Sequence, residues 1–135
     1  MAIIKDSGRQ HVQSAFLTIG FADPTTYGTA EDAIELPPGA EVIGGEVVVT
    51  TAFNSTTNTI TLGDVTTASR YTNAVDLKTA ARTALTLTGF VTSTTERFIR
   101  ANLAYTGTAP TAGSVRIRVD YAVPARATQA WGAGR

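Results

Sequence analysis

The sequence contains no cysteine and only one histidine, His11, among its 135 residues. Without cysteine there is no disulfide framework, no thiolate zinc site and no cysteine nucleophile. A single histidine excludes most multi-histidine metal sites and leaves one obvious general base for neutral pH. These shortages disfavour an enzyme, and we predict a protein that binds no metal and no cofactor.

Charged residues are also scarce, at 16% of the chain, against roughly 25% in a typical soluble domain. Eleven Lys and Arg balance eleven Asp and Glu, so the formal net charge is zero. A protein that wraps nucleic acid usually carries a basic excess, because its affinity comes largely from displaced counterions. The balance therefore argues against a nucleic-acid partner. With no net charge, copies of the protein repel one another only weakly, which favours a surface that stays in permanent contact with other protein subunits.

Long apolar runs are missing as well. No run approaches the roughly 20 residues that a membrane-spanning helix needs. Met1 to Ile4 are followed at once by Lys5 and Asp6, so the apolar core of a signal peptide does not develop. We therefore expect a chain that is made and kept in the cytoplasm and has no membrane partner.

The residues that are abundant favour β-structure. Hydrophobic residues make up 43% of the chain, and about one residue in six is threonine. Threonine, valine and isoleucine are the preferred residues of β-strands. Short β-like segments are separated by turns rich in Gly, Pro and Asn. These segments are residues 12–21, 31–36, 40–53, 59–65, 83–88, 97–105 and 115–123.

The last of these segments has the clearest alternation. Val115, Ile117 and Val119 face one side, while Arg116 and Arg118 face the other, as expected of an antiparallel sheet with one buried face. The chain shows no βαβ rhythm. It is therefore predicted to be all-β, a jelly-roll-like antiparallel β-sandwich with extended N- and C-terminal arms.

Three local patterns refine this prediction. Gly44-Gly45 lies inside a β-like segment, which indicates a bulge or bend. The composition of residues 54–58 predicts a turn that joins segments 40–53 and 59–65 into a β-hairpin. Asn73, with an aspartate three residues later, predicts the N-terminal cap of one short helix.

The two ends of the chain lack the strand pattern. We predict an N-terminal arm over residues 1–11, the sandwich domain over 12–124 and a C-terminal tail over 125–135. The tryptophan of the tail either folds back over its own sandwich or fills a pocket on a neighbouring subunit, since tryptophan is enriched at interfaces. The predicted partner-contacting residues are Ile3, Ile4, Arg126 and Trp131.

Candidate catalytic and metal-binding residues are few. Asp64 and Asp76 flank a Thr-rich loop and are candidate calcium ligands, but the Gly-Asp pair at the first position is more typical of a turn. Glu31 and Asp32 are a candidate acid–base pair, but neighbours on a strand face opposite sides. No sequence motif supplies the nucleophile and the orienting carboxylate that His11 would need as a catalytic base. We predict no catalytic residue and no metal ligand.

Four arginines lie on the last two predicted strands, namely Arg97, Arg100, Arg116 and Arg118. They form either a stripe that binds an anion or a partner, or a solvated sheet face in which Asp120 and Glu96 are their cross-strand partners. We favour the solvated face, because such charges also protect a sheet from aggregation.

A broader pattern is carried by Gly, Pro and Thr positions in residues 36–54, 59–64, 70–71, 76–85 and 107–121. Between Ala30 and Pro124 it resembles the small head decoration, or cement, proteins of tailed bacteriophages. The resemblance implies a jelly-roll-like domain, without a cofactor, that binds the outside of an icosahedral shell of major capsid proteins as a dimer or trimer. It also implies synthesis in the host cytoplasm and a place on the exterior of the virion.

A second function remains open at this point. A carbohydrate- or receptor-binding β-sandwich of a phage fibre or tail would have a similar composition. In such a module Tyr27, Tyr71 and Tyr105 would lie in loops and stack on sugar rings.

Overall fold

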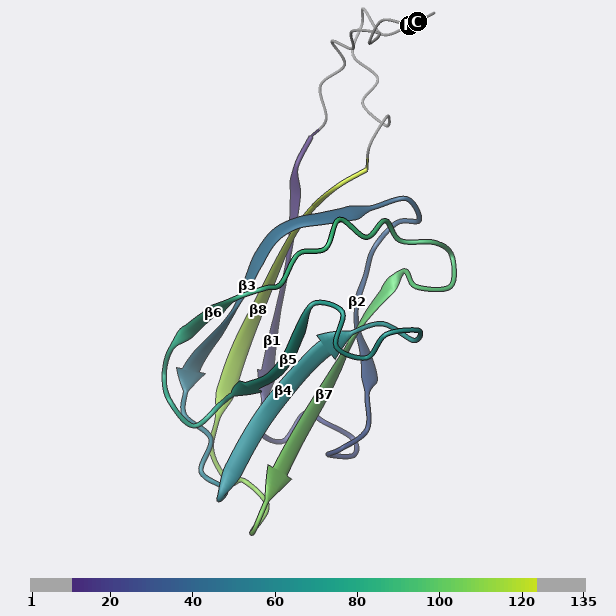
Figure 1. The fold of residues 1–135 in the computed structure, drawn as a ribbon. Coiled ribbons are helices and arrows are strands. Elements are labelled where there is room, and N and C mark those ends of the chain that lie inside the picture. The colour runs from purple at the N-terminus through teal and green to yellow at the C-terminus, as the bar shows by residue number, and fades with distance from the viewer. Residues whose placement is uncertain (1–10, 124–135) are drawn as a thin grey trace, which may run out of the picture.

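The computed structural model describes residues 11–123, which form two packed antiparallel β-sheets (Figure 1). Sheet A contains, in spatial order, β1 (Gln13–Gly20), β8 (Ser114–Ala122), β3 (Glu41–Thr51) and β6 (Arg82–Ala84). Sheet B contains, in spatial order, β2 (Glu31–Glu35), β7 (Phe98–Thr106), β4 (Thr57–Gly63) and β5 (Thr72–Asp76). The predicted all-β, jelly-roll-like sandwich is confirmed.

The core lies between the two sheets and is built from alternate residues of the long central strands. Val115, Ile117 and Val119 of β8 have no exposed surface. Across the sandwich, Ile60 and Leu62 of β4 are equally buried. This alternation is the period-2 pattern of a sheet that packs on one face, so the predicted alternation of residues 115–123 is confirmed.

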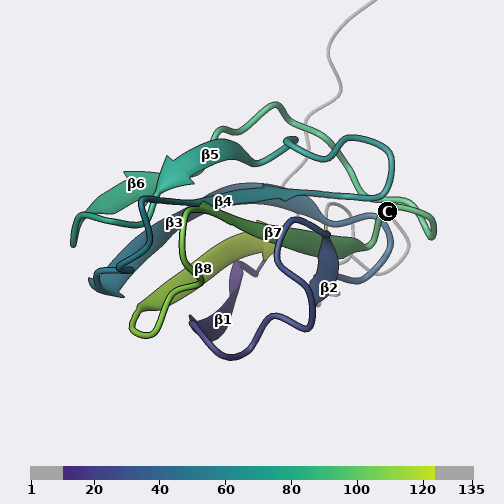
Figure 2. The ribbon, with the colours of Figure 1, turned by 90° about the horizontal axis from the view of Figure 1, so that it is seen from below.

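The two long sides of the sandwich differ. After β6 the chain ties the sheets together, because Leu85 N donates to Gly45 O at 3.2 Å and Thr86 N donates to Tyr71 O at 2.7 Å. On the other side, β1 and β2 are the last strands of their sheets. Figure 2 shows β5 and β6 on one side of the molecule and β1 and β2 on the opposite side. We call the side formed by β1 and β2 the open edge.

The predicted hairpin between residues 40–53 and 59–65 is wrong. β3 belongs to sheet A and β4 to sheet B, so the connection between them crosses the sandwich. Phe53 lies in this connection with only 2% of its surface exposed, and its N–H donates to Leu77 O at 3.0 Å. Burial of this ring between the sheets favours the crossing over a tight turn.

The predicted helix starting at Asn73 is also wrong, because residues 72–76 form β5. Val75 is buried and faces Ile60 of β4, and Thr72 faces Leu62. The pairing contains one extra residue on β5, and Ala74 there has a φ of 50°. Pairing with β4 and burial of Val75 outweigh the weak helical signal. This strand raises the number of strands to eight.

Smaller differences concern the ends of strands. The segment predicted over residues 83–88 is a strand only over β6, and Phe21 lies beyond β1 with 36% of its surface exposed instead of on the buried face. The bend predicted at Gly44-Gly45 is confirmed by a register shift in the pairing of β3 with β8. Gly45 has a φ of 141°, a conformation that favours glycine.

The predicted limits of the arm, the domain and the tail stay predictions, because residues 1–10 and 124–135 lie outside the described part of the chain. Within residues 11–123 no helix forms, and none is therefore long and apolar enough to cross a membrane.

Candidate functional site

The first candidate calcium ligand, Asp64, holds a turn together. Its carboxylate accepts hydrogen bonds from Thr66 N at 2.9 Å and Thr67 N at 2.7 Å, and it forms an ion pair with Arg70. The side chain of Asp64 is completely buried, and the Arg70 guanidinium also stacks on the Phe90 ring at 3.4 Å. These bonds identify the structural turn that the Gly-Asp pair predicted.

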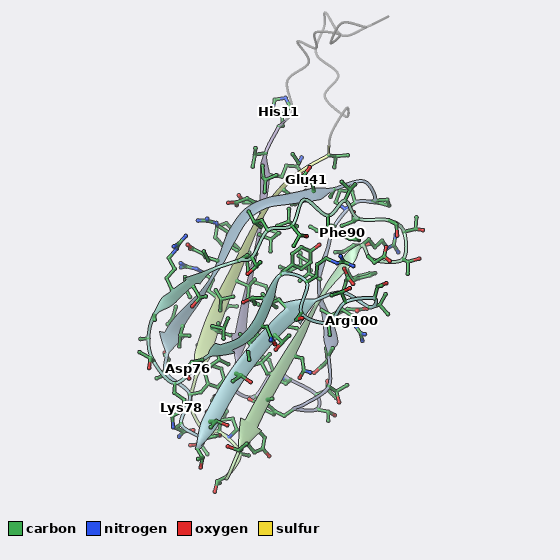
Figure 3. The ribbon with its side chains drawn as sticks, in the orientation of Figure 1. His11, Glu41, Asp76, Lys78, Phe90 and Arg100 are labelled. Carbon is green, nitrogen blue, oxygen red and sulfur yellow. The ribbon has the colours of Figure 1, made fainter. Side chains whose placement is uncertain are left out.

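The other candidate catalytic and metal-binding residues lie apart. Asp76 faces Thr59 near the start of β4, whereas Asp64 follows the end of that strand. Figure 3 shows Asp76 far along the sandwich from His11. No group of three or more His, Asp or Glu side chains that could hold a metal ion occurs within residues 11–123.

The neighbouring carboxylates Glu31 and Asp32 have separate partners. Glu31 Oε2 accepts a hydrogen bond from Thr25 N at 2.9 Å. Asp32 Oδ1 pairs with Arg100 Nε at 3.1 Å. Each carboxylate thus stabilises a different contact of β2, one with the preceding loop and one with β7.

The outer surface of sheet A carries most of the charge of that sheet. We call it the arginine face and define it by Phe16 of β1, Glu46 of β3, Arg82 of β6, and Arg116, Arg118 and Asp120 of β8. Three guanidinium groups there accompany two carboxylates. Opposite Arg118 in the register lies Phe16, whose surface is 63% exposed. A large exposed aromatic ring beside arginines has the composition of a protein-binding surface.

Glu46 is the centre of this face, and its side chain is only 11% exposed. It forms an ion pair with Arg82 and lies 3.6 Å from Arg118 Nη1 and 3.8 Å from Arg116 Nη2. The hydrogen bond from Arg82 lowers the pKa of the Glu46 carboxyl; desolvation opposes this shift, and the three positive charges add to it. The Nε atoms of Arg116 and Arg118 are buried without a hydrogen-bond partner among the described residues.

The expected partners of the arginines are therefore partly wrong. Asp120 does pair with Arg118, at 3.3 Å, but along the same strand. Glu96 accepts hydrogen bonds from Ser93 and Thr66 instead of pairing with an arginine. The residue that sequence analysis missed is Glu46, since only the register of β3 against β8 brings it opposite Arg118.

We expect Glu46→Gln to lower the melting temperature at pH 7, and the difference from the wild type to shrink as the pH falls below about 4. Glutamine keeps an acceptor for Arg82 but has no charge. Because the folded pKa is lowered, the stabilisation is present above the unfolded value of about 4.3 and is lost as the pH falls through the folded value. Thermal unfolding followed by circular dichroism over a pH series measures this. Glu35→Gln, which removes an exposed carboxylate 3.5 Å from Arg97, should change little, and a gap independent of pH would contradict the prediction.

The outer surface of sheet B is different in kind. Its centre is made of small neutral side chains of β4 and β7, because the alternate residues Ile60, Leu62 and Leu103 point into the core. These outward residues are Thr57, Thr59, Thr61, Asn102, Ala104 and Thr106. The Oγ1 atoms of Thr57 and Thr106 are hydrogen-bonded at 2.6 Å. Of the two outer surfaces, sheet A therefore offers the stronger ionic contacts.

The three tyrosines do not form the loop platform that the sugar-binding alternative requires. Tyr71 is buried in the core with 3% of its surface exposed, and burial raises the pKa of its hydroxyl to about 12. Tyr27 packs edge-on against Tyr105 with ring centroids 5.0 Å apart, and Tyr105 belongs to β7.

A groove lies at the open edge, and we call it the edge groove. It has a volume of about 180 Å³. Its lining combines apolar residues of both sheets with carboxylates from the β1–β2 loop and β2. The lining residues are Leu17, Ile19, Asp23, Pro24, Glu31, Asp32, Ala33, Ala101 and Leu103. A concave apolar floor with a few polar groups is the usual form of a binding groove.

No family model matches the chain, and no curated protein matches it. Among solved structures, a chain of the cyanophage Pam1 capsid asymmetric unit is similar with a TM-score of 0.68 and 25% sequence identity, over 92% of both chains. This chain has the fold of a phage capsid component. The expected resemblance to proteins of phage heads is thereby confirmed.

Two further solved structures show the same fold. A chain of the acid-stable capsid of Helicobacter pylori bacteriophage KHP30 has a TM-score of 0.57 at 18% identity, over 86% of this chain and 94% of that one. A chain of the Ralstonia phage GP4 capsid has a TM-score of 0.53 at 12% identity, over 90% of both chains. The fold is thus shared by chains of three phage capsids while the sequences have diverged widely.

The residues predicted to contact partners all lie outside the described part of the chain. They are Ile3, Ile4, Arg126 and Trp131. The arginine face and the edge groove are the surfaces that sequence analysis did not find as such. Each combines residues from strands far apart in the sequence, and only the strand order reveals them.

Proposed function

We propose that this protein is a structural, non-enzymatic component of a phage virion that binds the outer surface of the icosahedral head and stabilises the shell of major capsid proteins. The observation that carries the proposal is the fold shared with a chain of the Pam1 capsid over 92% of both chains. The proposal includes synthesis in the host cytoplasm, self-association as a dimer or trimer, and no nucleic-acid or membrane partner.

The arginine face is the surface that we assign to the shell. Its three arginines exceed its two carboxylates, and the side chains of Arg82, Arg116 and Arg118 are 58%, 43% and 31% exposed. An acidic patch on the shell would balance this excess positive charge and accept hydrogen bonds from the exposed parts of the guanidinium groups. The ring of Phe16, opposite Arg118 on the edge strand β1, would supply apolar contact. Many weak contacts of this kind, repeated over a shell, strengthen it collectively.

Purified protein added to expanded, undecorated heads of the phage that encodes it tests the proposal. We expect co-sedimentation that saturates, together with a higher temperature of head disruption and better resistance to a chelator. Binding should weaken as salt is raised, because ionic contacts are screened. Failure to co-sediment with any form of the head would refute the proposal.

The assignment of the face has its own test. Phe16→Asp places a charge on an exposed side chain, so the fold should be retained while binding to heads falls about tenfold or more, which corresponds to a loss of about 1.4 kcal/mol or more at the interface. Val65→Asp changes an exposed residue that follows β4 of sheet B and should bind as the wild type does. Binding of Phe16→Asp at the wild-type level would exclude the arginine face as the contact while leaving shell binding itself intact.

A further inference from the structure

The edge groove lies where both sheets end, so its long sides are the free edges of β1 and β2. Neither strand has a second pairing partner among the described residues. Free strand edges present backbone donors and acceptors that an extended segment can bind, while its alternate side chains enter the space between the sheets. The edge groove is therefore shaped for a segment of polypeptide.

The size of the groove fits one large side chain. Its volume is about 180 Å³, and an apolar cavity of about 150 Å³ binds benzene. The floor is apolar, with Leu17 and Ile19 of β1 and Leu103 of β7 contributing to it. An aromatic side chain is thus the natural occupant by size and by polarity.

The rim of the groove is acidic. Asp23 Oδ2 accepts a hydrogen bond from Gly20 N at 2.7 Å, and Glu31 accepts one from Thr25 N, so neither charge is neutralised by these bonds. Asp32 pairs with Arg100. Three carboxylates and one guanidinium leave a negative rim, which favours a segment that carries positive charge.

Residues 124–135 have the matching composition. They contain Trp131, the one tryptophan of the sequence, together with Arg126 and Arg135, and they contain no Asp or Glu. Residues 1–10 fit less well, because they have no aromatic residue and include Asp6. We propose that Trp131 of a second copy of this chain occupies the edge groove, with Arg126 and Arg135 facing its acidic rim.

The reach of the chain favours a second copy over the same copy. β8 ends at Ala122, beside the start of β1, whereas the groove lies near Ile19. Ile19 pairs with Val115, seven positions before Ala122 on β8, so the end of β8 is about 23 Å from the groove. Trp131 lies nine positions after Ala122. Because β8 itself runs away from the groove, about four of these nine positions would be needed to reverse the direction of the chain, and the remaining five span about 17 Å. A neighbouring copy has no such limit.

This inference extends the proposed function from shell binding to self-association, and its test uses no shell, so that the two can fail separately. In the full chain, fluorescence emission reports on Trp131 alone. We expect a blue-shifted emission that is protected from acrylamide at high protein concentration, and loss of both properties on dilution as the copies separate. Sedimentation should show Trp131→Ala as a monomer where the wild type associates, with at least tenfold weaker association. Arg126→Glu should also weaken association.

Mixing two variants identifies the pair of surfaces. Ala33→Phe fills the groove without adding a tryptophan, and Trp131→Ala removes the occupant while leaving the groove free. Each variant alone should fail to associate, whereas the mixture should form complexes and shift the emission of the Ala33→Phe copy to the blue. Glu31→Lys, which alters the rim instead of the floor, serves as a second groove variant if Ala33→Phe lowers the melting temperature. Val65→Ala is the matched surface control and should associate normally.

Two results would overturn the inference. One is a Trp131 emission that stays exposed and quenchable at every protein concentration. The other is a protected emission that persists in a monomer at any dilution, which would place the tryptophan in its own sandwich. Either result leaves the binding of heads through the arginine face untouched.

Discussion

Gly45→Ala is expected to destabilise the fold by about 3–5 kcal/mol, the sum of a strained backbone conformation and an overpacked site. Gly45 has a φ of 141°. A methyl group there would overlap the carbonyl oxygen of Arg118 and lie 2.7 Å from Leu85 Cδ1 and 3.2 Å from Val119 Cα. The neighbouring backbone belongs to β8, which pairs with β3 at the centre of sheet A, so relief of the overlap requires the two strands to separate. Urea unfolding of the full chain measures the loss.

Gly89→Ala is the matched control for this effect. Gly89 also has a positive φ, at 78°, but a Cβ there would meet no atom within 4 Å. Only the conformational cost of about 1–2 kcal/mol should remain. If both variants lower the free energy of unfolding by the same amount, the close approach of β3 and β8 at Gly45 does not contribute to the cost of the substitution.

Asp64→Ala should lower the free energy of unfolding by about 3 kcal/mol, the lower end of the cost of breaking a buried ion pair. The substitution removes the acceptor for Thr66 N and Thr67 N and leaves Arg70 without its carboxylate. Asp64→Asn keeps an acceptor for the two backbone groups and should lose less. Thermal and urea unfolding of both variants test this.

Asp76→Ala is the control for this second series, because Asp76 is exposed and, among residues 11–123, its carboxylate accepts one hydrogen bond, from Lys78 N at 3.0 Å. Its loss should cost about 1 kcal/mol or less. Addition of calcium should leave the melting temperature of the wild type unchanged. A rise with calcium that Asp64→Ala abolishes would show that this turn binds the ion after all.

The sequence was sufficient for features whose cause is local. The alternation of β8 follows from its own residues, since Val115, Ile117 and Val119 are apolar and the residues between them are charged. The bend at Gly44-Gly45 is equally local, because a pair of glycines in a strand serves few other purposes. Such patterns were enough to establish the β-sandwich and most of its strands.

Features that depend on distant partners could not be predicted in the same way. The helical spacing around Asn73 was real, but Val75 finds its place opposite Ile60 of β4. Phe53 is buried where the chain crosses from one sheet to the other, although the composition of residues 54–58, which follow it, is typical of a hairpin turn. In both cases, burial against residues remote in the sequence outweighed the local preference.

The candidate surfaces follow the same rule. In the sequence Glu46 is one polar residue in a mostly apolar strand, and only the register of β3 against β8 shows that Arg116 and Arg118 lie beside it. The edge groove joins Leu17 to Leu103, eighty-six positions later in the numbering, across two sheets. Sequence analysis could name the types of residue that make contacts, such as Trp131, but not the surfaces that receive them.

The positions of the strand ends also have a practical meaning. β1 begins and β8 ends at the same pole of the molecule, and the turn between β7 and β8 lies at the other pole (Figure 1). In that turn Thr108 and Ala109 are exposed, and they are the natural place to graft a foreign peptide. An epitope inserted between them would be displayed at the pole opposite the start of β1 and the end of β8, so a particle coated with this protein could present a foreign peptide there.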